Sequence, residues 1–63
     1  MTVTRTSLLV LRRRYAGLRE SGDKQMGLRR IRDALALLGR NDTRVAELAS
    51  QAEFYLPYAE ARR

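Results

Sequence analysis

Apolar side chains recur along this chain at intervals of three and four residues, in three separate stretches. In each stretch the spacing is 3, 4, 3, which is typical of one buried face of an amphipathic helix. The three sets are Leu8, Leu11, Tyr15 and Leu18; Leu28, Ile31, Leu35 and Leu38; and Val45, Leu48, Ala52 and Tyr55. The pattern therefore predicts three helices, each with one apolar face directed at a common centre.

Glycines and short polar side chains separate the three stretches. Gly22 is followed by Asp23, and Gly39 is followed by Asn41 and Asp42. A glycine just after a helix and an Asp or Asn just before the next one are common end and start signals. These signals predict helices over residues 7–21, 23–38 and 42–62.

Two segments depart from the simple helical pattern. Residues 1–6 are rich in threonine, and we expect a flexible tail that ends in a helix cap at Thr6 or Ser7. Pro57 lies inside the third stretch, and proline lacks the backbone N–H that would bond the carbonyl four residues earlier. We therefore expect the third helix to kink at Pro57, or to end near Tyr55 and start again.

The expected fold is all-α, a small three-helix bundle that forms a single domain over residues 1–63. The joints between the helices are short, so neighbouring helices must fold back on or cross each other. A chain of this size buries only about 60% of the surface of its unfolded form. Self-association would complete so thin a core, and we expect a homodimer.

The composition excludes most catalytic and metal chemistry. The chain of 63 residues has no Cys and no His, so it lacks the usual ligands of zinc, haem and iron–sulfur clusters and the commonest general base. Its seven acidic residues are scattered, and its four glycines form no phosphate-binding loop. We expect no enzyme activity, no catalytic or metal-binding residue, no cofactor and no small-molecule substrate.

The longest apolar run near the N-terminus is too short for a targeting or membrane segment. It comprises residues 8–11, whereas a signal peptide needs about 7–15 apolar residues and a membrane span about 20. The absence of cysteine fits a reducing compartment. We therefore expect a cytoplasmic protein without a membrane partner.

Positive charge dominates the first two thirds of the chain. The formal net charge is +6, with +7 over residues 1–44 and −1 over residues 45–63. Such a surface favours nucleic acid, although 12 of the 13 cations are Arg, which also indicates a GC-rich bacterial or phage genome. The candidate phosphate contacts are Arg13, Arg14, Arg29, Arg32, Arg40 and Arg44.

The sequence matches two DNA-binding arrangements in outline only. A helix-turn-helix would use the second and third helices, with a recognition helix that starts near Asn41. The local match is poor, because the expected turn glycine is missing and acidic residues follow. A ribbon-helix-helix would need a strand over residues 2–6, where Val3 is the one apolar residue. Nucleic acid is therefore the second hypothesis.

The third helix has aromatic residues on the side away from its apolar face. Phe54 and Tyr58 are four residues apart and lie opposite Val45 and Ala52 on a helical wheel. Exposed neighbouring aromatics favour an interface, unless the kink at Pro57 returns Tyr58 to the core. The protein-interface candidates are Phe54, Tyr58 and Arg62.

The function that this pattern favours is binding. We expect a small non-enzymatic regulator, of bacterial or phage type, that docks its helices on a protein partner as an inhibitor or adaptor. The alternatives are a nucleic-acid-binding regulator that uses the arginine-rich first two helices, and a structural or assembly subunit.

Overall fold

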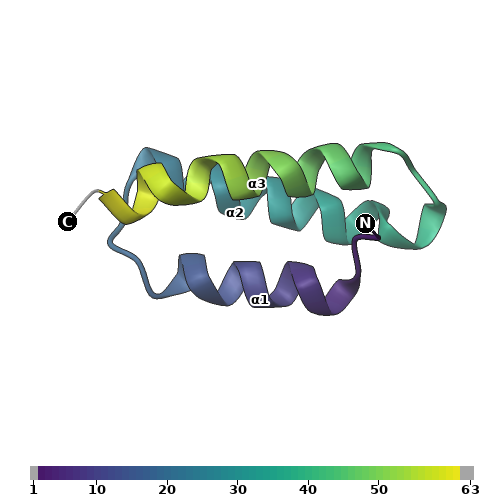
Figure 1. Ribbon diagram of the computed structural model, residues 1–63, viewed down its shortest axis with the longest axis horizontal. Helices are drawn as coiled ribbons and strands as arrows, with labels where there is room; N and C mark the ends of the chain where they lie inside the picture. The colour runs from purple at the N-terminus through teal and green to yellow at the C-terminus, as the bar shows by residue number, and fades with distance from the viewer. Residues whose placement is uncertain (1, 62–63) are drawn as a thin grey trace.

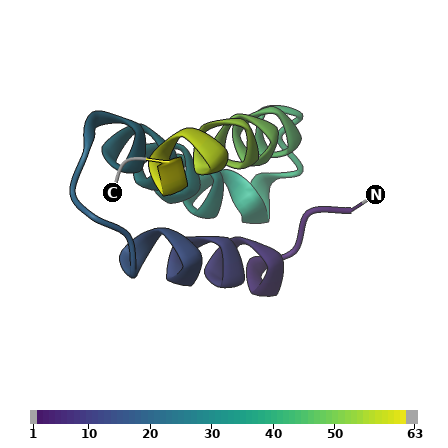
Figure 2. The ribbon, with the colours of Figure 1, turned by 60° about the vertical axis from the view of Figure 1, so that its left-hand side comes forward.

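The structure, a computed structural model, describes residues 2–61. It has three α-helices and a short 3₁₀ helix, in the order α1 (Arg5–Ala16), α2 (Gly22–Leu37), η1 (Leu38–Arg40) and α3 (Arg44–Ala61). α2 and α3 lie antiparallel and side by side along the long axis (Figure 1). α1 lies against this pair as a second layer (Figure 2). The prediction of an all-α fold with three helices is confirmed, and residues 2–61 contain no β-strand.

α1 begins two residues before its predicted start. The cap is Thr4, whose hydroxyl accepts a hydrogen bond from the Ser7 backbone N–H at 3.1 Å, while the Thr4 N–H donates to the Ser7 hydroxyl at 3.0 Å. Ser7 is therefore the third helical residue of a capping box and not the cap itself. Val3 before the cap and Leu8 in the first turn occupy the positions of a hydrophobic staple, and Val3 packs against the core.

α1 also ends five residues before its predicted end. Its last residue is Ala16, and the N–H of Gly17 bonds the carbonyl of Tyr15. The predicted end signal at Gly22 is wrong, because Gly22 is the first residue of α2. The cap of α2 is Ser21, whose hydroxyl accepts from the Lys24 backbone N–H at 3.1 Å. The linker between α1 and α2 thus comprises residues 17–21 and is longer than predicted.

The turn between α2 and α3 uses asparagine where glycine was predicted. Gly39 lies inside η1 without a positive φ, whereas Asn41 adopts the left-handed conformation with φ 51° and ψ 33°. Asparagine tolerates this conformation because its short polar side chain can bond locally. α3 then begins at Arg44, whose backbone N–H donates to the Asp42 carboxylate at 2.9 Å.

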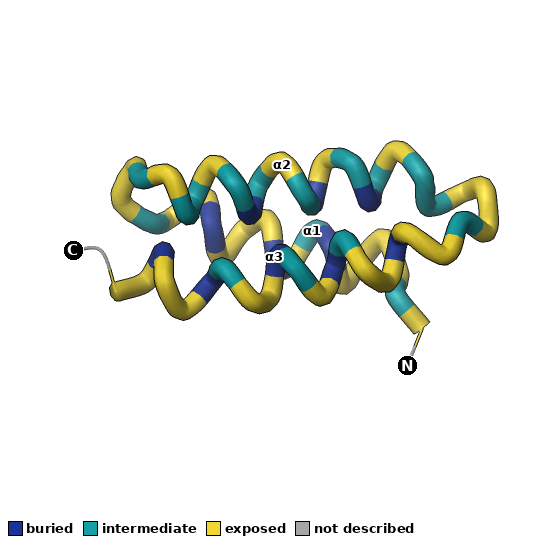
Figure 3. The backbone as a smooth tube through the Cα atoms, turned by 90° about the horizontal axis from the view of Figure 1, so that it is seen from above, coloured by how far each residue is buried: buried dark blue, intermediate teal, exposed yellow. Residues whose placement is uncertain are grey.

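The core lies where the three helices meet, and buried positions line the inner side of each helix (Figure 3). α1 contributes its predicted apolar face, whereas much of the face of α3 consists of alanine. The buried apolar residues are Leu8, Leu11, Tyr15, Ile31, Ala34, Val45, Ala49, Ala52, Leu56 and Ala59.

The buried faces of α2 and α3 differ in part from the predicted ones, although Ile31, Val45 and Ala52 are buried as predicted. Leu35 was expected at the centre of the α2 face, but it is half-buried, and its neighbour Ala34 is fully buried. On α3 Leu48 is half-buried and Ala49 is buried. α2 and α3 form the most extensive contact in the fold. Small side chains such as these alanines let two helices approach closely, so the larger leucines lie at the edge of the contact.

Tyr15 joins α1 to both other helices. Its side chain is 0% exposed, and its hydroxyl donates a hydrogen bond to the backbone carbonyl of Ala52 in α3. Its ring lies against Gly27 of α2, where any added Cβ would come closer than 3.0 Å to three atoms of Tyr15. Burial, with the nearby carboxylates of Asp23 and Glu60, raises the pKa of the Tyr15 phenol to about 12.

α3 runs without interruption through Pro57. The predicted alternative, an end near Tyr55 and a restart, is therefore wrong. Pro57 is exposed, and its neighbours along the helix, Leu56 and Ala59, are buried in the core. Because these two residues are packed on the inner side, tertiary contacts hold the helix together across the missing hydrogen bond. The kink at Pro57 stays a prediction.

Candidate interaction surfaces

The outer face of α3 carries two large exposed aromatic side chains. Phe54 is 62% exposed and Tyr58 is 53% exposed. Their ring centroids lie 5.4 Å apart with an interplanar angle of 47°, and the half-buried Tyr55 lies edge-on to Phe54 at 5.5 Å. The alternative in which Pro57 returns Tyr58 to the core is wrong. Both aromatic side chains lie outside the core, as predicted, and their role as an interface stays a prediction.

These aromatics belong to a longer row of residues on α3, which we call the α3 stripe. Its members are spaced 4, 3, 4 and 3 residues apart, so they lie along one side of the helix. The α3 stripe consists of Glu47, Gln51, Phe54, Tyr58 and Ala61. Gln51 is half-buried, and its side-chain oxygen accepts a hydrogen bond from Arg30 Nε of α2 at 2.7 Å. The polar N-terminal half of the stripe is thus hydrogen-bonded to α2 through Gln51, and its C-terminal half is apolar.

Two exposed glutamates precede the aromatic pair on α3. Glu47 lies on the α3 stripe, Glu53 precedes Phe54, and both are exposed. Within residues 2–61 the structure records no ion pair for either glutamate. The cation nearest to them on α3 is Arg44, whose Nη2 lies 2.7 Å from a carboxylate oxygen of Asp42. The α3 stripe thus carries one carboxylate, Glu47, and contacts one cation, Arg30 of α2, whose Nε donates to Gln51.

The Asp42–Arg44 pair is held at the start of α3 by several hydrogen bonds. Arg44 Nε donates to both carboxylate oxygens of Asp42 at 3.1 and 3.2 Å, and the Arg44 backbone N–H donates at 2.9 Å. These donors, the side-chain ones first, lower the pKa of Asp42 to about 2. Asp42 consequently neutralises one of the arginines predicted to contact phosphate.

The six arginines predicted to contact nucleic acid are all exposed, but half of them pair with carboxylates. The ion pairs are Arg14 with Glu60 at 3.7 Å, Arg32 with Asp33 at 3.3 Å, and Arg44 with Asp42 at 2.7 Å. Arg13, Arg29 and Arg40 form no ion pair within the described part of the chain. Exposed pairs of this kind contribute little to stability, yet they offset part of the positive charge.

The fold does not gather these arginines into one patch. Arg13 and Arg14 lie at the end of α1, whereas Arg40 and Arg44 lie at the turn between α2 and α3. These two segments are at opposite ends of a molecule 36 Å long (Figure 1). α2 and α3 also lie side by side, while the two helices of a helix-turn-helix cross steeply. Residues 2–6 form no strand, so the ribbon-helix-helix arrangement is absent as well.

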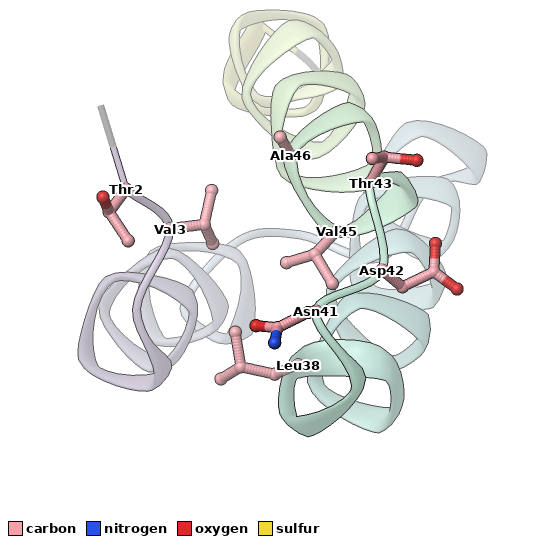
Figure 4. Close-up of a pocket in the computed structure, with 8 residues that line it drawn as sticks. All are labelled: Thr2, Val3, Leu38, Asn41, Asp42, Thr43, Val45 and Ala46. Atoms are coloured by element: carbon pink, nitrogen blue, oxygen red, sulfur yellow. The ribbon is translucent and has the colours of Figure 1, made fainter.

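A small hollow near the N-terminus was not predicted. It lies between the N-terminal segment, the turn after α2 and the start of α3 (Figure 4). Val3, Leu38 and Val45 supply its apolar lining, and Asp42, already bound to Arg44, is its one titratable side chain. The sequence feature that could have predicted this hollow is Val3, which stands in the position of a hydrophobic staple before the cap of α1. The lining offers no pair of groups suited to acid–base chemistry.

The described residues offer neither a metal site nor a membrane-spanning helix. Arg62 lies outside the described residues. Among residues 2–61 no group of three or more His, Cys, Asp or Glu side chains lies close enough to hold a metal ion. In the same part of the chain no helix has both the length and the apolar character needed to cross a membrane.

Comparison of the chain with protein-family models, with curated proteins and with solved structures finds no match in any of the three.

Proposed function

We propose that this chain is a small non-enzymatic regulatory protein, of bacterial or phage type, that docks the α3 stripe on a protein partner as an inhibitor or adaptor. The observation that supports this proposal is the exposed Phe54–Tyr58 pair. The core side of the same helix is already filled by Ala52 and Leu56, which are 0% and 4% exposed. The aromatics therefore add little to the fold, and exposed aromatics are enriched among residues that dominate binding energy.

Nucleic-acid binding is the second candidate function. It is supported by the net charge of +6 and by the exposed Arg13, Arg29 and Arg40, which form no ion pair among residues 2–61. It is weakened by the spread of these residues along the molecule and by the carboxylates around the α3 stripe. Binding of this kind would depend steeply on salt, because each neutralised phosphate releases counterions.

Three further expectations belong to this proposal. A homodimer would cover the same aromatic face, and a domain of this size gains stability when a second copy adds buried surface. A kink at Pro57 would set the direction of the last turn of α3. A cytoplasmic location agrees with the cysteine-free composition. The role of a structural or assembly subunit would use the same surface.

Affinity capture from a bacterial lysate treated with nuclease tests the proposal. The parent chain is compared with Phe54→Ala and with Val10→Ala, a matched control because Val10 is 55% exposed on α1. We expect a stoichiometric protein partner that survives nuclease and moderate salt, and that is lost with Phe54→Ala but not with Val10→Ala. Capture that disappears with nuclease, or that ignores Phe54→Ala, contradicts the proposal.

A further inference from the structure

We infer that the outer side of the α1–α2 pair binds the phosphate backbone of a nucleic-acid duplex. This surface, which we call the arginine face, consists of five exposed residues: Arg5, Arg12, Arg13, Arg29 and Arg32. Arg5 and Arg12 were not among the arginines predicted to contact phosphate. The inference rests on the second candidate function, nucleic-acid binding, and is independent of the docking role of the α3 stripe.

Two contacts to α3 show which sides of α1 and α2 point outward. Arg14 of α1 pairs with a glutamate of α3, and Arg30 of α2 donates to a glutamine of α3. Successive residues of a helix are about 100° apart around its axis. Arg12 and Arg32 each lie two residues from one of these contacts, and so about 200° around the helix from it. Because α1 packs on α2, the two sides that point away from α3 adjoin.

The other three arginines extend this surface. Arg5 is seven residues before Arg12 and therefore lies on the same side of α1, two turns earlier. Arg13 lies opposite the buried side of α1. Arg29 is one turn before Arg32 on α2 and lines the same shallow hollow. From Arg5 to Arg13 the face is about 12 Å long, a length over which a duplex carries about seven phosphates.

Few carboxylates oppose the positive charge of this face. α1 contains no acidic residue, and the three face arginines on α1 form no ion pair within residues 2–61. Two carboxylates lie at the edge on α2 and the linker. Asp33 is 3.3 Å from Arg32, and Glu20, which lines the same hollow as Arg29, is 3.9 Å from Lys24 Nζ. The face therefore keeps an excess of positive charge, which favours a polyanion.

The side chains around the arginines favour a duplex over other polyanions. Val10 is the one large hydrophobic residue exposed on α1, whereas protein interfaces have an apolar centre and membrane-binding helices insert apolar side chains. Tyr15, the one aromatic residue of the two helices, is buried, so no ring is available to stack on unpaired bases. α1 has no Asn or Gln to read base edges, and Gln25 of α2 donates to Glu20. These side chains fit a duplex bound through its phosphates, with little dependence on base sequence.

Fluorescence anisotropy with a labelled DNA duplex of about 20 base pairs, over a range of salt concentrations, provides the test. An RNA duplex, a DNA duplex of unrelated sequence and one of the single strands are measured alongside. We expect the two DNA duplexes to bind within about threefold of each other and at least one kind of duplex to bind more tightly than the single strand. The logarithm of the affinity should fall with the logarithm of the salt concentration, by about 0.9 for each DNA phosphate contacted. Amide chemical shifts should change in α1 and around residues 29–32.

Two triple variants separate the arginine face from the overall charge, because each lowers the formal net charge by three. The face variant combines Arg5→Gln, Arg12→Gln and Arg13→Gln. The control variant combines Arg14→Gln, Arg40→Gln and Arg44→Gln, which lie off the face. We expect the face variant to bind the duplex at least tenfold more weakly at low salt and to lower the salt slope by about 2–3. The control should lose less than about threefold, and circular dichroism of the same samples checks that both variants are folded.

The failures of this inference and of the functions proposed above are distinguishable. A parent chain that binds no duplex at low salt removes nucleic-acid binding as a function, and the inference with it. Duplex binding that both triple variants weaken equally leaves that function in place and overturns the arginine face as its site. Tighter binding of the single strand, a preference above tenfold for one DNA duplex, or equally tight binding of a polyglutamate peptide overturns the proposed occupant. Phe54→Ala should leave duplex binding unchanged, and a loss of duplex binding in this variant would overturn the separation of the two surfaces.

Discussion

Substitution of Gly27 by alanine tests the packing of the three helices. By helix propensity alone, alanine at an internal position of α2 would stabilise the helix by about 1 kcal/mol. The structure predicts the opposite sign. A Cβ at position 27 would come closer than 3.0 Å to three atoms of Tyr15, which is fully buried and bonded to the carbonyl of Ala52. Because the new Cβ would meet the hydroxyl end of this buried ring, we expect the ring to leave its site.

The size of the effect follows from what the Tyr15 ring loses. Overpacking a core costs about 1–3 kcal/mol, and emptying an aromatic site completely costs about 3–5 kcal/mol. After the propensity gain is subtracted, we expect Gly27→Ala to lower the free energy of unfolding by about 2–4 kcal/mol. A domain of this length has only about 3–9 kcal/mol in total, so the variant should melt at least about 10 °C lower.

Thermal and urea unfolding followed by circular dichroism measure this difference. Gly22→Ala is the matched control, because Gly22 lies in the same helix with nothing within 4 Å of an added Cβ. The control should be neutral or stabilise the domain by up to about 1 kcal/mol. Combining Gly27→Ala with Tyr15→Leu should cost less than the sum of the two single changes. A Gly27→Ala variant as stable as the parent would refute the proposed packing of Tyr15.

Other predictions concern titration and the core. Tyr15→Phe should cost about 1 kcal/mol of unfolding free energy, because the buried hydrogen bond from the Tyr15 hydroxyl to the Ala52 carbonyl is lost. The fold raises the pKa of Tyr15 from 10.0 to about 12. The stabilisation by the neutral phenol is therefore complete below pH 10 and is lost as the pH rises through 12. In alkaline unfolding, Tyr15→Phe should not show this loss. The fold lowers the pKa of Asp42 from 3.8 to about 2. The contribution of the Asp42 carboxylate to the free energy of unfolding is therefore present above about pH 4 and lost as the pH falls through 2. Asp42→Asn should make the urea midpoint less dependent on pH in this acidic range. Ile31→Ala should lower the free energy of unfolding by about 2–5 kcal/mol, and Leu35→Ala, at a half-buried position, by about 1–2 kcal/mol. Equal losses for the two variants in urea unfolding would contradict the observed placement of the core.

The three helices could be predicted because each has an apolar face at helical spacing. This spacing identifies a helix even where its first and last residues are predicted wrongly. The buried face of α2 could not be predicted in the same way. A search for large apolar residues finds Leu28 and Leu35, whereas the structure buries Gly27 and Ala34. Small residues carry little hydrophobic signal, and their burial depends on how closely another helix approaches. That approach is a property of the whole fold.

The exposure of Phe54 and Tyr58 could also be predicted, because the opposite side of the same helix already had enough apolar residues to fill a core. The charge that the exposed arginines offer to a partner could not. The neutralisation of Arg44 depends on a local turn that brings the Asp42 carboxylate to its guanidinium. The count of cations in the sequence therefore overstates the positive charge available to a partner.

The central claim is that the α3 stripe is a protein-docking surface, and a titration with the purified captured partner tests it most directly. Isothermal titration calorimetry compares the parent chain with Phe54→Ala, and circular dichroism of the same samples confirms an unchanged melting temperature. We expect Phe54→Ala to lose about 2 kcal/mol or more of binding free energy, which is about thirtyfold in Kd. Equal affinity of the two proteins, with both folded, would contradict it.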